Sequence, residues 1–170
     1  VNAGNSIQAG GNFNTVVGDE AGTAITTGDN NTALGYIALD ATTTGATNTA
    51  LGWSALSSNT TGAENVAVGG QALAANTTAS NNTAVGRSAL VANSTGAENT
   101  AVGKSAGAAL TTSSRNVAVG YEALSTATAY NENTAVGYRA LKANTDGYSN
   151  TSVGVNSLLA NTTGNNNVAV

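Results

Sequence analysis

Apolar and polar residues recur along this chain with a period of 17 residues, and the register never slips over nine complete copies. Counted from a recurring asparagine, each copy follows the consensus N-T-A-V-G-x-x-A-L-x-A-N-T-T-G-x-x, whose positions are numbered 1 to 17 below. Self-similarity of this kind is typical of solenoids, in which each repeat forms one coil and packs against its neighbours. The sequence therefore predicts a solenoid over residues 14–166, an irregular lead-in unit at 1–13 and the start of a tenth repeat at 167–170.

Positions 2 to 4 hold β-branched or small apolar residues and no charged residue in any copy, as in Thr83, Ala84 and Val85. This pattern predicts one short strand per coil. Because adjacent residues of a strand face opposite sides, it leaves neither face of the strand polar. One face can pack inside the coil, and the simplest cover for the other is a second copy of the chain. The predicted fold is an all-β parallel β-solenoid, or β-roll, that forms a homo-oligomer.

The rest of the coil is less determined by its pattern. Leucine is usual at position 9 and suits the coil interior, but positions 4, 8, 9 and 11 also match one stripe of a helix. Positions 6 to 12 are therefore open to two interpretations, an extended segment or a short helical turn. Positions 13 to 15 are typically Thr-Thr-Gly, a turn sequence that closes the coil.

Two residue types are constant at their positions. Asparagine at position 1 is predicted to form a ladder of side-chain amides that hydrogen-bond along the axis. Glycine at position 5 is predicted at a corner that needs a positive φ or a close backbone approach. The asparagines are Asn14, Asn31, Asn48, Asn65, Asn82, Asn99, Asn116, Asn133, Asn150 and Asn167, and the glycines are Gly18, Gly35, Gly52, Gly69, Gly86, Gly103, Gly120, Gly137 and Gly154.

Composition disfavours several classes of function. Only 8% of residues are charged, and there is no histidine or cysteine, so a histidine-based catalytic triad and the usual zinc sites lack their residues. The carboxylates also lack the spacing of calcium solenoids. A net charge of −4 with five Lys and Arg disfavours nucleic-acid binding. No apolar run reaches the roughly 18 residues that span a bilayer. We therefore predict no catalytic residues, metal, cofactor, nucleic acid or membrane contact.

Several local motifs are explained by the repeat itself. The stretch 103–107 (GKSAG) matches the nucleophile elbow of hydrolases, but it aligns position for position with 86–90 (GRSAL). Glycosylation sequons, Asn-Thr-Thr or Asn-Ser-Thr, begin at position 12 of four copies. They are part of the repeat consensus, so the need for repeated structure explains them without glycosylation. Threonine rows at positions 13 and 14 resemble the arrays of ice-binding solenoids.

Position 6 carries aromatic residues on adjacent coils. Exposed aromatics can contact glycans or a host surface, whereas neighbouring rings in a solenoid also stabilise each other by stacking, which is the interpretation we favour. The residues concerned are Tyr36, Trp53, Tyr121 and Tyr138.

The strings 31–39 (NTALGYIAL) and 133–141 (NTAVGYRAL), with the recurring NTTG, resemble repeats of bacteriophage tail fibres and related bacterial surface proteins. The resemblance covers residues 14–170 and implies a homotrimeric fibre in a virion tail or at a cell surface, with such repeats often preceding an endosialidase-type chaperone domain. The Asn-Thr-Ala-Val-Gly core also resembles the head repeats of trimeric autotransporter adhesins, which form β-rolls from shorter repeats.

The function predicted on these grounds is structural, the shaft of a fibrous appendage that spans distance and presents a recognition tip located elsewhere. The alternative is an adhesin-type module that binds glycans or a host surface through its exposed positions. A third hypothesis is ice binding through the threonine rows.

Overall fold

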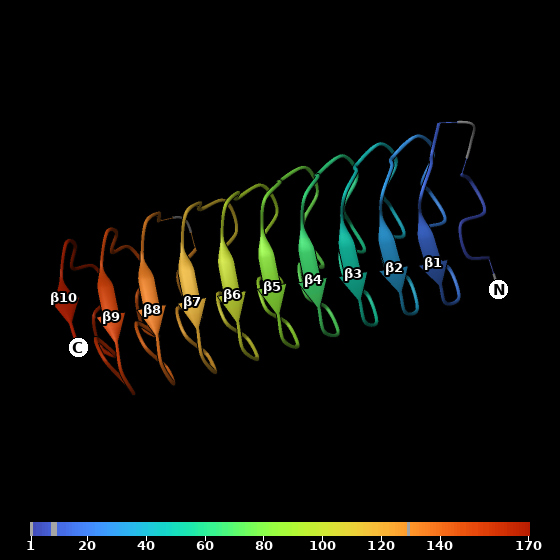
Figure 1. Cartoon of the computed structure of the whole chain (residues 1–170). Helices are drawn as coiled ribbons and strands as arrows, with labels where there is room; N and C mark the ends of the chain where they lie inside the picture. Colours follow the sequence, from blue (N-terminus) through green and yellow to red (C-terminus); the bar gives the residue numbers. More distant parts are fainter. Residues whose placement is uncertain (1, 8–9, 129) are drawn as a thin grey trace.

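The computed structural model describes residues 2–7, 10–128 and 130–170, which form one parallel β-solenoid of about nine coils (Figure 1). Within these residues the only regular elements are strands, one per coil, in a sheet whose order follows the chain from β1 to β10. The strands are β1 (Thr15–Val17), β2 (Thr32–Leu34), β3 (Thr49–Leu51), β4 (Val66–Val68), β5 (Thr83–Val85), β6 (Thr100–Val102), β7 (Val117–Val119), β8 (Thr134–Val136), β9 (Thr151–Val153) and β10 (Val168–Ala169). The prediction of an all-β parallel β-solenoid is confirmed.

Every strand pairs with the equivalent residues of the next coil. Thr83 lies opposite Thr100, Ala84 opposite Ala101, and Val85 opposite Val102, and the same register holds along the whole sheet. Before the first repeat, the amide of Gly4 donates to the carbonyl of Ala21 at 2.9 Å, so part of the lead-in unit stacks on the first coil. Residues 1, 8 and 9 of that unit lie outside the described part of the chain.

The core is a column of small side chains inside the coils. Alanine at position 3 faces inward from the strand and belongs to the same buried cluster as alanine and leucine at positions 8 and 9. Ala84, Ala89 and Leu90, for example, are all fully buried. Two of these three side chains are a single methyl group, so the coil is thin and its interior leaves little space for larger residues.

The helical turn considered for positions 6 to 12 is wrong, because the described residues contain no helix. Each segment is instead a succession of tight turns. Positions 7 and 9 have left-handed backbone conformations, as at Ile37 (φ +50°) and Leu39 (φ +53°), and a helix cannot include them. The amide of Leu39 donates to Ala55 of the next coil at 3.1 Å instead of to its own segment. The apolar residues face inward because the chain turns repeatedly.

The corner after each strand from β1 to β9 is a glycine with a φ between +127° and +137°. At Gly86 a Cβ atom would lie 2.6 Å from the backbone of Gly103 in the next coil. A side chain is excluded there both by backbone conformation and by contact between coils. The described residues contain no helix suited to crossing a membrane.

Candidate functional site

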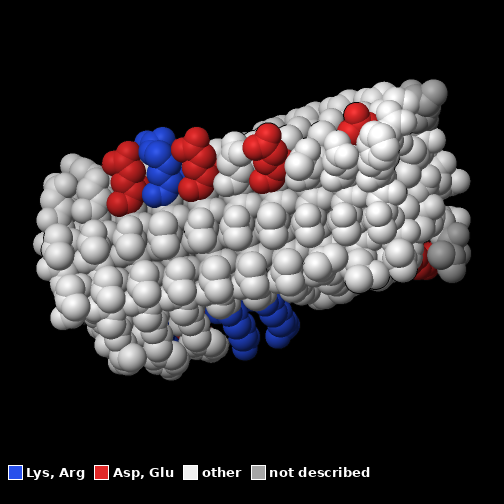
Figure 2. Space-filling model, in the orientation of Figure 1, with Lys and Arg blue, Asp and Glu red and all other residues white. Residues whose placement is uncertain are grey.

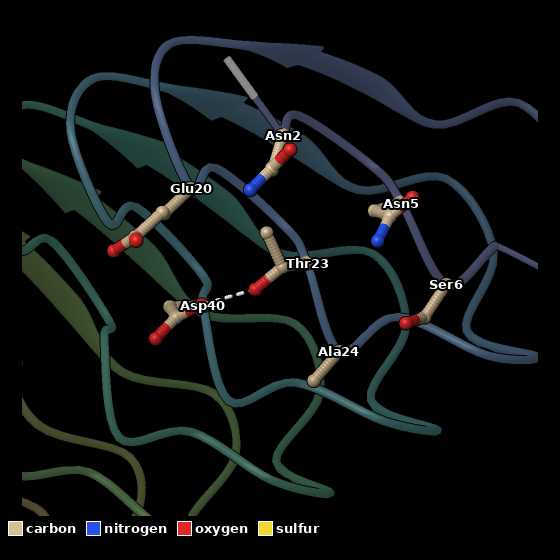
Figure 3. Close-up of a pocket in the computed structure, with 7 residues that line it drawn as sticks. All are labelled: Asn2, Asn5, Ser6, Glu20, Thr23, Ala24 and Asp40. Carbon is tan, nitrogen blue, oxygen red and sulfur yellow. Dashed lines mark hydrogen bonds between the residues drawn. The ribbon is translucent and has the colours of Figure 1, made fainter.

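A pocket lies at the N-terminal end, between the lead-in unit and the first two coils (Figure 3). Its volume is about 470 Å³, and the hydroxyl of Thr23 donates to the carboxylate of Asp40 inside it. The lining holds amides, hydroxyls and two carboxylates but no histidine, lysine or arginine to activate a nucleophile or stabilise an oxyanion. Within the described residues no three His, Cys, Asp or Glu side chains are placed to hold a metal ion. The lining residues are Asn2, Asn5, Ser6, Glu20, Thr23, Ala24 and Asp40.

The asparagines of position 1 hydrogen-bond along the axis of the rod. The side-chain oxygen of Asn31 accepts from the backbone amide of Asn48 at 2.9 Å and from its Nδ2 at 3.2 Å. The same Nδ2 donates to the carbonyl of Gly62 at 2.8 Å, which ties the end of the coil to its beginning. Both asparagines are fully buried. Each amide therefore serves register and coil closure together and is not exposed to a ligand.

A second asparagine ladder, which the sequence analysis did not predict, lies at position 12. Nδ2 of Asn76 donates to Oδ1 of Asn59 at 2.9 Å, and Nδ2 of Asn93 donates to Oδ1 of Asn76 at 3.1 Å. These three asparagines begin sequons, and all are fully buried. The only sign of this ladder in the sequence is the recurring Asn of N-T-T-G. The sequence does not show that the side chain at position 12 faces the interior of the coil.

The threonine row at position 13 is also engaged within the rod. Hydroxyls of this row donate to the position 13 carbonyl of the following coil, as Thr43 does to Thr60 (3.2 Å) and Thr60 to Thr77 (3.0 Å). A hydroxyl that donates to the backbone retains only its acceptor capacity toward water. The row therefore supports coil stacking, and ice binding at these positions gains no support from the geometry.

Position 6 carries aromatic residues on two pairs of adjacent coils, and the two pairs differ in whether their rings stack. Tyr121 and Tyr138 stack with ring centroids 5.5 Å apart, and the guanidinium of Arg139 lies 5.0 Å from the centroid of Tyr138. No such stacking joins Tyr36 to Trp53 within the described residues. Tyr36 and Trp53 are about half exposed, at 50% and 49%. These two rings are the more accessible pair.

A small ion-pair network lies beside the stacked tyrosines. The carboxylate of Glu122 accepts from Lys142 at 2.6 Å and from Arg139 at 3.0 Å. The hydrogen bond from Lys142, then those from Tyr121 and Arg139, lower the pKa of Glu122 to about 2. Glu122 in turn raises the pKa of the Tyr121 hydroxyl. The network joins consecutive coils on the outside of the rod.

The most extended surface feature is the outer face of the sheet, here called the strand face, formed by positions 2 and 4 of every coil. It carries Thr or Val at position 2 and Val or Leu at position 4, with Leu34 49% and Val102 37% exposed. Figure 2 shows it as an uncharged band along the rod, with charged side chains at its two borders. An exposed apolar band of this length is typical of an interaction surface.

Comparisons with protein-family models, with curated proteins and with solved structures found no match to this chain.

Proposed function

We propose that this chain is a shaft segment of a fibrous appendage such as a phage tail fibre, which spans distance and presents a recognition tip located elsewhere. The observation that carries the proposal is the uninterrupted in-register stacking of equivalent coils from β1 to β10. In such an arrangement length is set by repeat number, because each coil contacts its neighbours and adds one strand spacing.

Three ladders support a mechanical role. Strand pairing and the position 1 amides join each coil to the next along the rod axis. The position 13 hydroxyls do so from Thr26 to Thr128 and from Thr145 to Thr162. With a rise of about 4.8 Å per coil, nine coils span roughly 43 Å. A rod of this kind resists bending because any bend would open several ladders at once.

A length-change experiment in the appendage tests this function. Duplication of residues 14–166 should lengthen the appendage by about 43 Å in electron micrographs, since the duplicated coils continue the same ladders. Attachment to the host should persist, because recognition lies in the tip. An unchanged appendage length, or antibody label for this chain found away from the shaft, would contradict the proposal.

A second candidate function is glycan or host-surface binding, and the exposure of Tyr36 and Trp53 favours it. Trp53 lies beside Gly70 of the next coil, where a Cβ would be 3.6 Å from its ring and no side chain competes for the position. If the rings stack on sugars, Tyr36→Ala with Trp53→Ala abolishes binding to a glycan array and the exposed control Thr44→Ala does not. Equal array binding by both variants would eliminate this candidate.

A further inference from the structure

The strand face is a long uncharged band whose two borders differ in charge. Position 17 precedes each strand and position 6 follows it, so these two positions form the borders on either side. Along β4 to β8 the position 17 border holds Glu64, Asn81, Glu98, Arg115 and Glu132, and the position 6 border holds Gly70, Arg87, Lys104, Tyr121 and Tyr138. One border is therefore net acidic, and the other is basic and aromatic over these coils. Figure 2 shows the charged side chains on the two sides of the uncharged band.

Several of these border charges have no partner within the rod. Arg115 pairs with Glu132 at 2.9 Å along the acidic border. Glu64, Glu98 and Arg87 are exposed and form no ion pair within the described part of the chain. Unpaired charges beside an exposed apolar band are typical of the rim of an interface, where they select the partner and its orientation.

We infer that the strand face is covered by a second copy of this chain, with the two rods parallel and each acidic border against the basic border of the other copy. The inference deepens the proposed shaft function and rests on it, since parallel rods place equivalent ends together. The uncharged side chains of positions 2 and 4 form the centre of the contact. The charges at positions 17 and 6 form its rim.

Symmetry connects the charge pattern to the orientation. In a parallel assembly the rotation axis runs along the rods, so the position 17 border of one copy meets the position 6 border of the next, for two copies or three. At the level of β6 this brings Glu98 toward Lys104. In an antiparallel pair the two-fold axis runs along the strands, and each border meets its own equivalent. With all ten strands overlapping, the coil of β5 would then lie opposite the coil of β6. Arg87 would meet Lys104 of the other copy, and Glu98 would meet Asn81 instead of Lys104.

The size of the face suits this partner. Ten strands spaced by about 4.8 Å, with two rows of side chains about 7 Å apart, give a band roughly 45 Å long and about 10 Å wide. Two such bands bury on the order of 1,000 Å² in total before the borders are counted, which reaches the lower range of stable interfaces. The match requires a flat partner of equal length, and a second copy provides one.

The first test measures mass by sedimentation equilibrium on the full chain. Val85→Lys places a charge in the centre of the face and should convert the assembly to monomer, whereas Thr78→Lys, at an exposed site away from the strand, should not. Circular dichroism verifies that both variants keep the fold. A wild-type chain that is monomeric at about 100 µM, or equal association of both variants, would overturn the inference. The length measurement of the shaft is independent of this result.

The second test addresses orientation. Glu98→Lys and Lys104→Glu should each raise the dissociation constant about threefold to tenfold, and the two changes together should restore it, because surface ion pairs contribute modestly. Added salt should weaken the wild-type assembly. In an antiparallel pair Lys104→Glu would instead tighten binding, because it would place a carboxylate opposite Arg87, and that result would contradict the inference.

Energy transfer between single-cysteine variants provides a direct readout of the same point. Thr27→Cys and Thr163→Cys are both exposed position 14 sites, eight coils or about 38 Å apart along the axis. Donor and acceptor both at residue 27 should give higher transfer than a mixture of 27-labelled and 163-labelled chains. The reverse order would show antiparallel rods and overturn the inference.

Discussion

The coil of residues 82–98 and the coil of residues 99–115 fill the same interior in different ways. The first has Leu90 at position 9 and Asn93 at position 12, the arrangement of most coils. The second has Gly107 and Leu110 at these positions, and Leu110 is fully buried. A Cβ on Gly107 would lie 3.0 Å from the side chains of both Leu110 and Leu90. The leucine side chain is therefore supplied from position 12 where position 9 lacks it.

The leucine at position 12 in the second coil interrupts the second asparagine ladder. Oδ1 of Asn93 is buried without a hydrogen-bond partner, because the next coil has leucine where an amide would donate. The hydroxyl of Ser113, in the second coil, is likewise buried without a partner. The first coil of the rod has the same exchange, with Gly22 and Ile25. Both kinds of coil therefore keep one large apolar side chain in the core, even where this costs hydrogen bonds.

The largest predicted effect comes from replacing the leucine at position 12 with the asparagine of most coils. Leu110→Asn leaves positions 9 and 12 of this coil without an apolar side chain and should lower the free energy of unfolding by about 3 kcal/mol. Adding Gly107→Leu should recover most of this loss, because the coil then matches its neighbours. Urea unfolding of both variants checks the coupling. Additive effects of the two changes would show that the positions do not share one space.

The opposite conversion should have a somewhat smaller effect. Asn93→Leu adds a side chain where Leu90 already fills the coil, so overpacking should cost about 2 kcal/mol. With Leu90→Gly as well, the coil becomes equivalent to that of residues 99–115 and stability should return in large part. Thermal unfolding provides the measurement. A double variant with a lower melting temperature than Asn93→Leu alone would contradict this account.

The ladders of the two regions can be compared by single alanine substitutions. Asn76 donates to Asn59 and Ala79 and accepts from Asn93, whereas Asn93 donates to Asn76 and Gly96 but accepts nothing. Asn76→Ala should therefore destabilise the fold by about 1 kcal/mol more than Asn93→Ala. Equal costs in denaturant titrations would show that Asn93 is satisfied in solution.

The smallest effect is expected at the surface, where the type of coil beneath should not matter. The pKa of Glu122 is lowered to about 2 in the folded chain, below its unfolded value. Its contribution to stability is therefore present above the unfolded pKa and lost as pH falls toward 2. Glu122→Gln should flatten the melting temperature between pH 5 and about pH 2 relative to wild type. Glu20→Gln, at the same position 7 of the first coil, is the matched control, and identical pH profiles for both variants would contradict the role of the network.

Much of the fold follows from local patterns. Three uncharged residues before a glycine, repeated every 17 residues, predict strands such as β5 and their stacking. The turns of positions 6 to 12 were not predictable in this way, because the alanine and leucine spacing of 89–90 fits a helix as well as successive turns. The choice depends on hydrogen bonds to neighbouring coils, such as that from Leu90 to Ala106.

The length of the coil, the location of its strand and the positions that tolerate charge could be predicted from the sequence, because they follow from a period and from residue type. The folded chain was needed to show that position 12 faces inward as a second ladder, and that position 9 and position 12 share one volume. It also placed the acidic and basic borders on opposite sides of the strand face. These properties join residues that meet only after the chain has closed one coil and stacked it on the next.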